Sequence, residues 1–323
     1  MKRFWLTLLA AGLAGCGNSS GNVAVPEKPV LYLYPEEEME VTVTLDFDGT
    51  LTSTYPAYGD GWTVTARPDG TLTNPATGRE YYCLFWEGIT EAEYDFSTGF
   101  CVAGEDTAAF LEDALDRLGL TEREADEFII YWLPKLEGNP YNLLSFQTEA
   151  YTDSAGLTID PAPDTLIRVF LAWKGLDAPV EVEPHKLTAP ERAGRLPVDR
   201  GSFCCYPIPK RRGIHMKRFW LTLLAAGLAG CGNSSGNVAV PEKPVLYLYP
   251  EEEMEVTVTL DFDGTLTSTY PAYGDGWTVT ARPDGTLTNP ATGREYYCLF
   301  WEGITEAEYD FSTGFCVAGE DTA

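Results

Sequence analysis

The chain has 323 residues, a formal net charge of −27 and a hydrophobic content of 44%. This hydrophobic content suffices for a folded core and excludes a wholly disordered chain. The strong acidity argues against nucleic acid as a partner, because phosphate binding needs clustered lysine and arginine.

A long internal repeat divides the chain. Residues 216–323 repeat residues 1–108 without a substitution, unlike the short, diverged repeats of solenoid proteins. The unique unit is therefore residues 1–215. Each copy holds 16 acidic and 5 basic residues, so subtracting one copy from the totals of 49 and 22 leaves the unit a net charge of −16.

The chain begins with the layout of an export signal. A basic start precedes the apolar run Phe4–Gly12, which is shorter than the ~20 residues of a membrane-spanning helix. The next four residues, Leu13–Cys16, resemble the lipobox of bacterial lipoproteins, in which the cysteine receives a diacylglycerol and the peptidase cuts just before it. The resemblance implies a signal peptide at 1–15, a lipidated Cys16 and a tether at 16–29. An ordinary secretory signal with a chance cysteine is the alternative.

This layout predicts a location in the cell envelope. The lipid would hold the protein on the outer side of the cytoplasmic membrane, or on the outer membrane of a host with two membranes. The expected partners are the membrane, through the anchor, and an unidentified extracellular ligand. Cys231 is the same cysteine in the repeated copy, where we expect no lipidation.

The residues after the tether predict an antiparallel sheet. Val30–Pro35 is a short strand ended by proline. Val41–Phe47 and Trp62–Ala66 alternate apolar and polar residues, the period of a half-exposed strand. Tyr81–Trp86 and Gly99–Val102 are further strands, and turn sequences rich in Asp, Gly and Pro separate the first of these elements.

The period then becomes helical. Apolar residues at helical spacing predict a helix from about Glu105 that stops at Gly119. Thr121–Glu124 is a capping box that opens a second, shorter helix.

Three more strands follow in the prediction. Phe128–Leu133 is rich in aromatic and β-branched residues and stops at a proline, so we expect a buried strand there. Leu143–Phe146 and Thr165–Trp173 are the other two. The order of strands, helices and strands predicts an α+β fold, with an antiparallel N-terminal sheet, two helices and further strands in one domain at residues 30–194.

Three sequence blocks belong together: KPVLYLYP at Lys28–Pro35, YWLP at Tyr131–Pro134 and PDTLIRVF at Pro163–Phe170. They resemble a family of uncharacterised exported proteins and lipoproteins, frequent in Gram-positive gut anaerobes. The similarity runs from about residue 28 to residue 193. The resemblance implies the lipoprotein layout and a single α+β body, and it implies no reaction, ligand or catalytic residue.

Cys83 and Cys101 are the two cysteines of this body, and both fall in predicted strands. An even pair in an exported protein suggests a disulfide, which would contribute about 3 kcal/mol by closing the intervening loop. Two separate buried thiols explain the pair equally well.

Asp46–Thr50 matches the first motif of haloacid-dehalogenase-type phosphatases. In that family the first aspartate is the nucleophile, the second is the general acid/base, and Mg²⁺ neutralises the charges. That chemistry needs a buried parallel strand followed by a helix, whereas the pattern around Asp46 and Asp48 predicts a half-exposed strand, turns and more strands. An Asp-Gly hairpin turn explains the same letters. A Mg-dependent exported phosphatase is therefore the alternative hypothesis.

The preferred hypothesis is a cell-surface lipoprotein whose domain binds a glycan, a peptide or an envelope component without catalysis. Tyr131, Trp132 and Arg168 are the candidate binding residues, because aromatic rings stack on ligands and Arg168 is a single charge in an apolar strand that needs a carboxylate partner. Packing in the core and on the sheet face is the more frequent role of such aromatic residues, and a structural ion pair is the favoured role of Arg168. His185, the one histidine of the body, is predicted on the surface. No cofactor or metal is expected, since the sequence lacks Cys/His spacing for zinc.

Residues 195–215 differ from the rest of the chain. They hold five basic residues and one acidic residue, and Cys204 and Cys205 are adjacent. Codons for Lys210–Gly213 can form a purine-rich ribosome-binding sequence, and three codons separate its two arginine codons from Met216. We interpret the segment as a frameshift after about Gly194 with readthrough into a tandem copy; a basic linker between two domains is the alternative. The copy ends level with Ala108, and we expect it not to fold alone.

Overall fold

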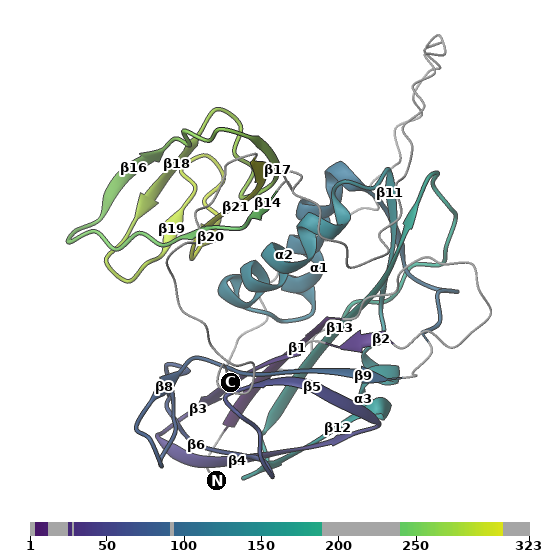
Figure 1. Cartoon of the computed structure of the whole chain (residues 1–323), viewed down its shortest axis with the longest axis vertical. Helices are drawn as coiled ribbons and strands as arrows, with labels where there is room; N and C mark the ends of the chain where they lie inside the picture. The colour runs from purple at the N-terminus through teal and green to yellow at the C-terminus, as the bar shows by residue number, and fades with distance from the viewer. Residues whose placement is uncertain (1–3, 12–24, 28, 91–93, 189–239, 306–323) are drawn as a thin grey trace, which may run out of the picture. The chain divides into compact units, whose positions relative to one another are not determined.

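The structure, a computed structural model, describes residues 4–11, 25–27, 29–90, 94–188 and 240–305. These residues form three α-helices and four sheets in which almost all strand pairs are antiparallel (Figure 1). The fold is α+β, as predicted. It is mostly β, and its strands are divided over several sheets rather than one N-terminal sheet. The predictions for Cys16, Cys231 and residues 195–215 lie outside the described residues.

Two sheets face each other in the first half of the chain. The larger has eight strands in the order β10-β11-β13-β1-β3-β9-β2, with β5 also paired to β9. Its strands are β1 (Phe4–Ala11), β2 (Val25–Glu27), β3 (Val30–Pro35), β5 (Gly49–Tyr55), β9 (Leu84–Thr90), β10 (Phe100–Ala103), β11 (Tyr141–Phe146) and β13 (Thr165–Leu176). The smaller has the order β12-β4-β6-β7-β8, formed by β4 (Met39–Phe47), β6 (Trp62–Ala66), β7 (Leu72–Thr73), β8 (Glu80–Tyr81) and β12 (Ala155–Asp160).

Apolar residues cover both faces of the larger sheet. On one face, Leu33, Trp62, Trp86 and Phe170 belong to the core between the two sheets, which α3 (Thr148–Ser154) closes with Tyr151. On the other face, residues such as Val169 pack with the helices. The domain thus has three layers: sheet, sheet and helices.

The helix pair consists of α1 (Thr107–Arg117), entered through a 3₁₀ turn at Gly104–Asp106, and α2 (Glu122–Leu136). Gly119, at φ 91°, ends α1 in a Schellman motif: its N–H donates to Asp116 O, and the N–H of Leu120 donates to Leu115 O. The capping box of α2 is also present, since Glu124 N–H donates to Thr121 Oγ1 at 3.3 Å and Thr121 N–H donates to Glu124 Oε2 at 2.7 Å. The sequence predicted the end of α1 and the start of α2 correctly. It predicted a shorter second helix, which is wrong, because α2 has 15 residues and α1 has 11.

The predicted strand at Phe128–Leu133 is wrong, because these residues are part of α2. Six consecutive apolar residues fit a buried strand and a helix buried on more than one side equally well. Here Phe128, Ile129, Trp132 and Leu133 are all buried, and Pro134 lies in the last turn of the helix. A proline there removes the N–H that would pair with Ile130 O, a loss that is tolerated because the helix ends two residues later.

Strand β1 lies in the interior of the larger sheet, between β3 and β13. It pairs parallel with β13 from Trp5↔Thr165 to Ala11↔Leu171, and antiparallel with β3 from Phe4↔Pro35 to Leu9↔Val30. The apolar run that resembles a signal peptide therefore has a structural partner on each side.

The repeated sequence folds twice into the same arrangement of strands. We call residues 25–90 the first β-module and residues 240–305 the second β-module. The second module forms one sheet in the order β14-β21-β15, with β17 paired to β21, and another in the order β16-β18-β19-β20. Its strands are β14 (Val240–Glu242), β15 (Val245–Leu246), β16 (Met254–Val258), β17 (Thr265–Tyr270), β18 (Trp277–Ala281), β19 (Leu287–Thr288), β20 (Glu295–Tyr296) and β21 (Leu299–Thr305).

Candidate functional site on the helix pair

The two cysteines of the body are not bridged. Cys83 is a buried free thiol, and Cys101 is a partly buried free thiol that accepts a contact from the N–H of Val180 at 3.4 Å. Burial, followed by the nearby charge of Glu127, raises the pKa of the Cys83 thiol to about 12. Of the two possibilities raised by the sequence, the structure has the separate thiols, and Cys83 is held in its unreactive protonated form.

The structural setting of Asp46 and Asp48 does not fit a phosphatase. β4 pairs antiparallel with β12 and β6, and both aspartates are exposed. At Asp48 the chain crosses from the smaller sheet to the larger one and continues as β5, so neither the parallel strand nor the following helix of the phosphatase motif is present. The chain forms a crossing between sheets and not the hairpin that the sequence suggested.

Close packing accounts for the glycine of this motif. A Cβ on Gly49 would lie 2.3 Å from Ile89 O and 2.7 Å from the ring of Phe47. The glycine of this Asp-Gly-Thr sequence is therefore explained by the close approach of β5 and β9, which leaves no room for a Cβ.

Tyr131, Trp132 and Arg168 do not come together. Trp132 is fully buried among the residues under the helices, with Tyr131 half-buried beside it at a ring distance of 5.0 Å. Arg168 lies on the opposite face of β13, where its guanidinium is 4.5 Å from the ring centre of Tyr151 and Nη2 donates to Ala155 O at 2.6 Å. The predicted binding trio is thus split by the larger sheet.

Within the described ranges, the carboxylate partner expected for Arg168 is not found. The salt bridges formed among the described residues do not include Arg168, which uses the aromatic ring and the carbonyl instead.

His185 is partly buried in a polar cluster, contrary to the surface position predicted for it. Its Nε2 lies 2.8 Å from Ser145 Oγ, which also donates to Thr98 O at 3.0 Å and accepts from Gln147 Nε2 at 2.6 Å. Ser145 is fully buried and its hydroxyl is already bonded on all sides, so it is not poised as a nucleophile. The cluster instead fixes the segment around Glu183, whose carbonyl accepts the N–H of Gly99 at 2.9 Å.

Three carboxylates form a second polar surface that the sequence did not reveal: Glu112 on α1, and Glu122 and Asp126 on α2. The capping box places Glu122 in the first turn of α2, and Asp126 follows one turn later on the same side. We call these three residues the helix-pair surface. The signal that could have revealed it is the apolar run of α2, because a helix that is apolar all round is buried on more than one side.

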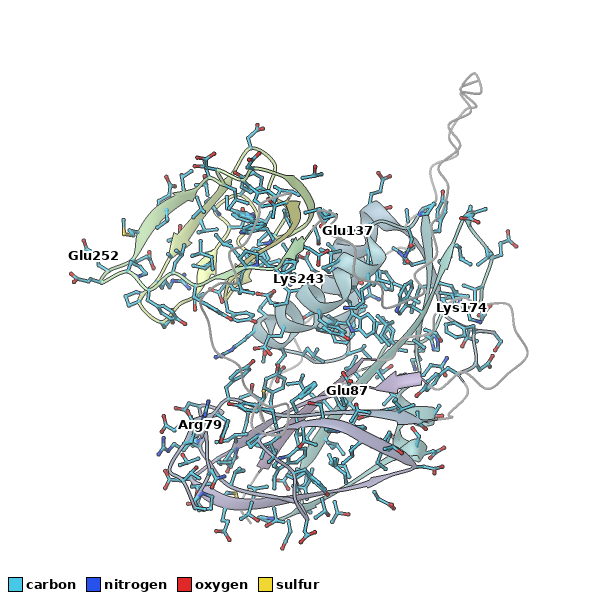
Figure 2. All side chains as sticks on the ribbon, viewed as in Figure 1. Arg79, Glu87, Glu137, Lys174, Lys243 and Glu252 are labelled. Atoms are coloured by element: carbon cyan, nitrogen blue, oxygen red, sulfur yellow. The ribbon has the colours of Figure 1, made fainter. Side chains whose placement is uncertain are left out.

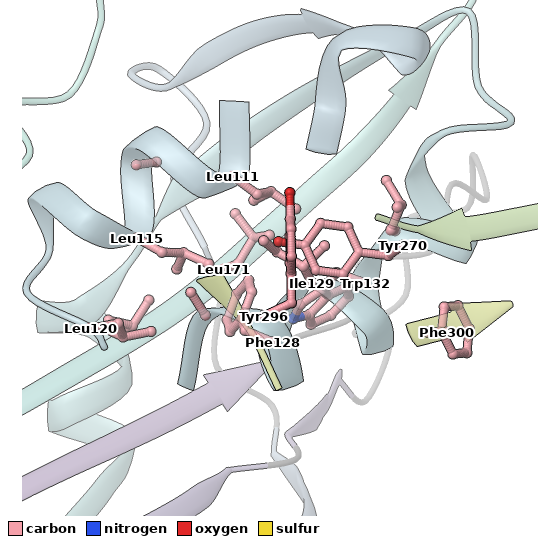
Figure 3. Packing of buried hydrophobic residues seen from close by; sticks show 14 of the residues in the cluster. Leu111, Leu115, Leu120, Phe128, Ile129, Trp132, Leu171, Tyr270, Tyr296 and Phe300 are labelled. Atoms are coloured by element: carbon pink, nitrogen blue, oxygen red, sulfur yellow. The ribbon is translucent and has the colours of Figure 1, made fainter. Parts of the chain in front are cut away.

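The second β-module fills the helix-pair surface. Arg294 forms ion pairs with Glu112 (Nε to Oε1, 3.2 Å) and Glu122 (Nη2 to Oε2, 3.2 Å), and its Nη2 lies 3.9 Å from Asp126 Oδ1. The hydroxyl of Tyr270 lies 3.0 Å from both Glu112 Oε1 and Asp126 Oδ1. Figure 3 shows Tyr270 and Tyr296 packed among side chains of the helix pair, including Ile129 and Trp132.

Of these three carboxyl groups, Asp126 has the most strongly shifted pKa. It is fully buried, and burial raises its pKa to about 8 against the lowering effect of the Tyr297 N–H, Arg294 and Tyr270. The N–H of Tyr297 donates to Asp126 Oδ2 at 3.1 Å. All described partners of this carboxyl, apart from its own helix, thus come from the second module.

Equivalent tyrosines of both modules also contact Arg123, which lies between Glu122 and Asp126 in α2. The guanidinium of Arg123 lies 5.7 Å from the ring centre of Tyr82 and 5.4 Å from that of Tyr297, its counterpart in the repeat. The hydroxyl of Tyr32 donates to the carboxylate of Glu127. Helix α2 is therefore enclosed by aromatic residues of two copies of one sequence.

Two other features are absent from the part of the chain that the structure describes. There, no group of three or more His, Cys, Asp and Glu side chains is arranged to hold a metal ion. In the same residues, no helix has the length and apolarity needed to cross a bilayer.

Comparison with known proteins gives a relative but no function. No protein-family model matches the chain, and no solved structure matches it. An "Uncharacterized protein in bglA 3'region" of Butyrivibrio fibrisolvens is 43% identical over 88 residues, which are 26% of this chain and 90% of that protein. The chain therefore belongs to the family of this Butyrivibrio protein.

Proposed function

We propose that the chain is an exported, lipid-anchored binding protein without catalytic activity. Cys16 carries the lipid, and the protein is held in the cell envelope, on the outer side of the cytoplasmic membrane or on the outer membrane of a host with two membranes. Residues 30–194 form the body of its single α+β domain, and β1 and β2 add two strands to the larger sheet of that body. Its helix-pair surface binds a protein face that presents an arginine between tyrosines.

Asp126 is the observation that supports this proposal. A carboxyl group that is fully buried costs free energy unless hydrogen bonds and charge compensate for it. Here the Tyr270 hydroxyl, the Tyr297 N–H and Arg294 supply the compensation, and all three come from the second module. The surface therefore has the properties of a docking site for an aromatic and cationic protein face rather than of a solvated helix.

The repeat offers a matched pair of variants to test this recognition. Arg294→Glu replaces the positive charge between Glu112 and Glu122 with a negative one beside the buried Asp126 carboxyl. We expect it to release the helix-pair surface, so that amide exchange around Glu122 and Asp126 becomes about tenfold faster. Arg79→Glu makes the identical change in the first module, where Arg79 does not touch these carboxylates, and we expect no change in that exchange. Equal exchange in the two variants contradicts the proposed recognition.

A further inference from the structure

The sequence of the β-module occurs twice in the chain, whereas that of the helix pair occurs once. In the second module, Tyr270, Arg294 and Tyr296 lie against the helix-pair surface. We call these three residues the Arg–Tyr face of the second module. Its counterparts in the first module, at the same positions of the repeat, are Tyr55, Arg79 and Tyr81.

The two rings of the Arg–Tyr face, and the contact of the arginine with the second ring, have the same geometry in both modules. The rings of Tyr55 and Tyr81 meet edge to face at 5.5 Å and 80°, and those of Tyr270 and Tyr296 at 5.5 Å and 83°. Arg79 lies 5.6 Å from the ring centre of Tyr81, and Arg294 lies 5.5 Å from that of Tyr296. The face is thus already arranged before it meets a partner, which reduces the entropic cost of docking.

The two copies of this face differ in what covers them. Tyr270 is 1% exposed against the helix pair, whereas Tyr55 is 40% exposed. Arg79 is also exposed, and the salt bridges among the described residues do not include it (Figure 2 labels Arg79). One molecule therefore carries a filled helix-pair surface and a second, uncovered Arg–Tyr face.

We propose that the Arg–Tyr face of the first module binds the helix-pair surface of a second copy of this chain, and that the second module blocks this assembly by occupying the surface within its own molecule. The proposal rests on the recognition described under the proposed function. Face and surface are different parts of the molecule, so each added copy leaves one of each open, and the contact builds a head-to-tail chain rather than a closed dimer.

The internal copy has the advantage in the intact protein. Both modules offer the same side chains, so their direct contacts are equivalent, but the second module is joined to the surface by the chain. Its local concentration is on the order of millimolar, well above that of free protein in a dilute solution. The intact chain is therefore monomeric at micromolar concentration, and loss of the internal contact exposes the surface to other molecules.

Sedimentation of the full 323-residue chain, produced without export so that residues 1–15 remain, tests the proposal. We expect the unmodified chain and the Arg79→Glu variant to be monomeric. The weight-average mass of Arg294→Glu should rise with protein concentration, by about twofold or more at about 100 μM, because a head-to-tail contact continues to add copies. The double variant Arg79→Glu/Arg294→Glu should return to a monomer, because it lacks both arginines. Tyr270→Phe, which removes one hydroxyl, is a milder second variant that should associate in the same direction.

The outcomes separate the two proposals. If Arg294→Glu frees the helix pair for amide exchange but stays monomeric, the self-assembly is wrong and the proposed recognition stands. If Arg294→Glu leaves the helix pair protected, the recognition itself is wrong. Association of the double variant to the same extent as Arg294→Glu overturns the role of Arg79, and association of the unmodified chain overturns the blocking role of the second module.

Discussion

Asp126 makes docking of the second module depend on pH. Its pKa of about 8 in the docked state lies above the ordinary value of 3.8, so the docked state holds a proton that the undocked carboxyl releases between these values. Docking therefore weakens as pH rises toward 8, by up to about 1.4 kcal/mol per pH unit, and is weakest above that pKa. The charges facing Asp126 are those of Arg294, Glu122 and Glu112.

Asp126→Asn should remove this dependence. The amide keeps a hydrogen-bonding group toward both Tyr270 and Tyr297 but cannot ionise. We expect the radius of gyration from small-angle scattering to increase between about pH 5 and about pH 8.5 in the unmodified chain, as docking weakens, and to stay constant in the variant. A variant that still expands with pH assigns the titration to another group.

Cys16 is the residue that we predict to carry the lipid anchor. The motivation is the Leu-Ala-Gly-Cys sequence at the end of the apolar run. Cys16→Ser, expressed in a bacterial host, should leave an unprocessed precursor that incorporates no fatty-acid label. Cys231→Ser is the matched control and should be labelled like the unmodified chain. Label on the Cys16→Ser protein contradicts the lipobox interpretation.

At the scale of elements, Trp132 tests whether α2 supports the core or binds a ligand directly. Its side chain is fully buried and lies near Phe128 and Tyr131, at ring distances of 6.1 and 5.0 Å. Trp132→Ala should lower the free energy of unfolding in urea by about 3–5 kcal/mol, the usual cost of deleting a buried aromatic side chain. A loss below about 1 kcal/mol shows that the position tolerates truncation and is not part of the core.

The elements that the sequence predicted correctly are those with a local physical cause. The alternation in Val41–Phe47 and the cap at Thr121–Glu124 depend on neighbours in the chain. The apolar run at Phe128–Leu133 has no such local cue, because burial on two sides removes the helical period. α3 was missed for a related reason: in Thr148–Ser154, Tyr151 is the one large buried side chain, so no periodic pattern exists.

The candidate site could not be predicted because it depends on residues far apart in the chain. Ser145 and His185 are 40 residues apart, and Asp126 meets residues about 150 positions later. The repeat adds a second difficulty, since Arg79 and Arg294 have identical neighbours in sequence and different neighbours in space.

At the scale of the whole molecule, identical sequences differ in burial according to what covers them. Leu31 is 1% exposed beneath the layer that includes β12, β13 and α3, whereas its counterpart Leu246 is 37% exposed, because the second module has no such layer among the described residues. Exposed Tyr249 and Met254 follow the same pattern. The second module therefore exposes sheet residues whose counterparts are covered in the first module.

A fragment of residues 231–323 should therefore lack a cooperative unfolding transition. It would lose the contacts of Tyr270 and Phe300 with the helix pair, and with them part of a small core. Circular dichroism during heating is the measurement, with the full chain as the control. A sigmoidal transition in the fragment shows that the module is stable by itself.

Removal of β1 gives a second prediction at this scale. Between Thr165 and Phe170, β13 has β1 as its described strand partner, and β3 pairs with β9 only at Val30 and Leu31. A chain that begins at Cys16 should lose at least about 5 kcal/mol of stability relative to the full chain. The seven residue pairs between β1 and β13 contribute roughly 0.5–1.5 kcal/mol each, and the six pairs between β1 and β3 are lost as well. Denaturation in urea measures the loss, and equal midpoints contradict it.

The position of β1 also makes folding compete with export. On the proposed export route, Phe4–Ala11 must reach the translocation machinery as an accessible apolar segment, yet the same residues are enclosed between β3 and β13 once the domain folds. Each molecule can use the segment in one of these two ways. In a chain that folds before it reaches the membrane, the signal segment is therefore inaccessible to the export machinery. The rate of folding relative to the rate of delivery to the membrane then decides how much of the protein leaves the cytoplasm.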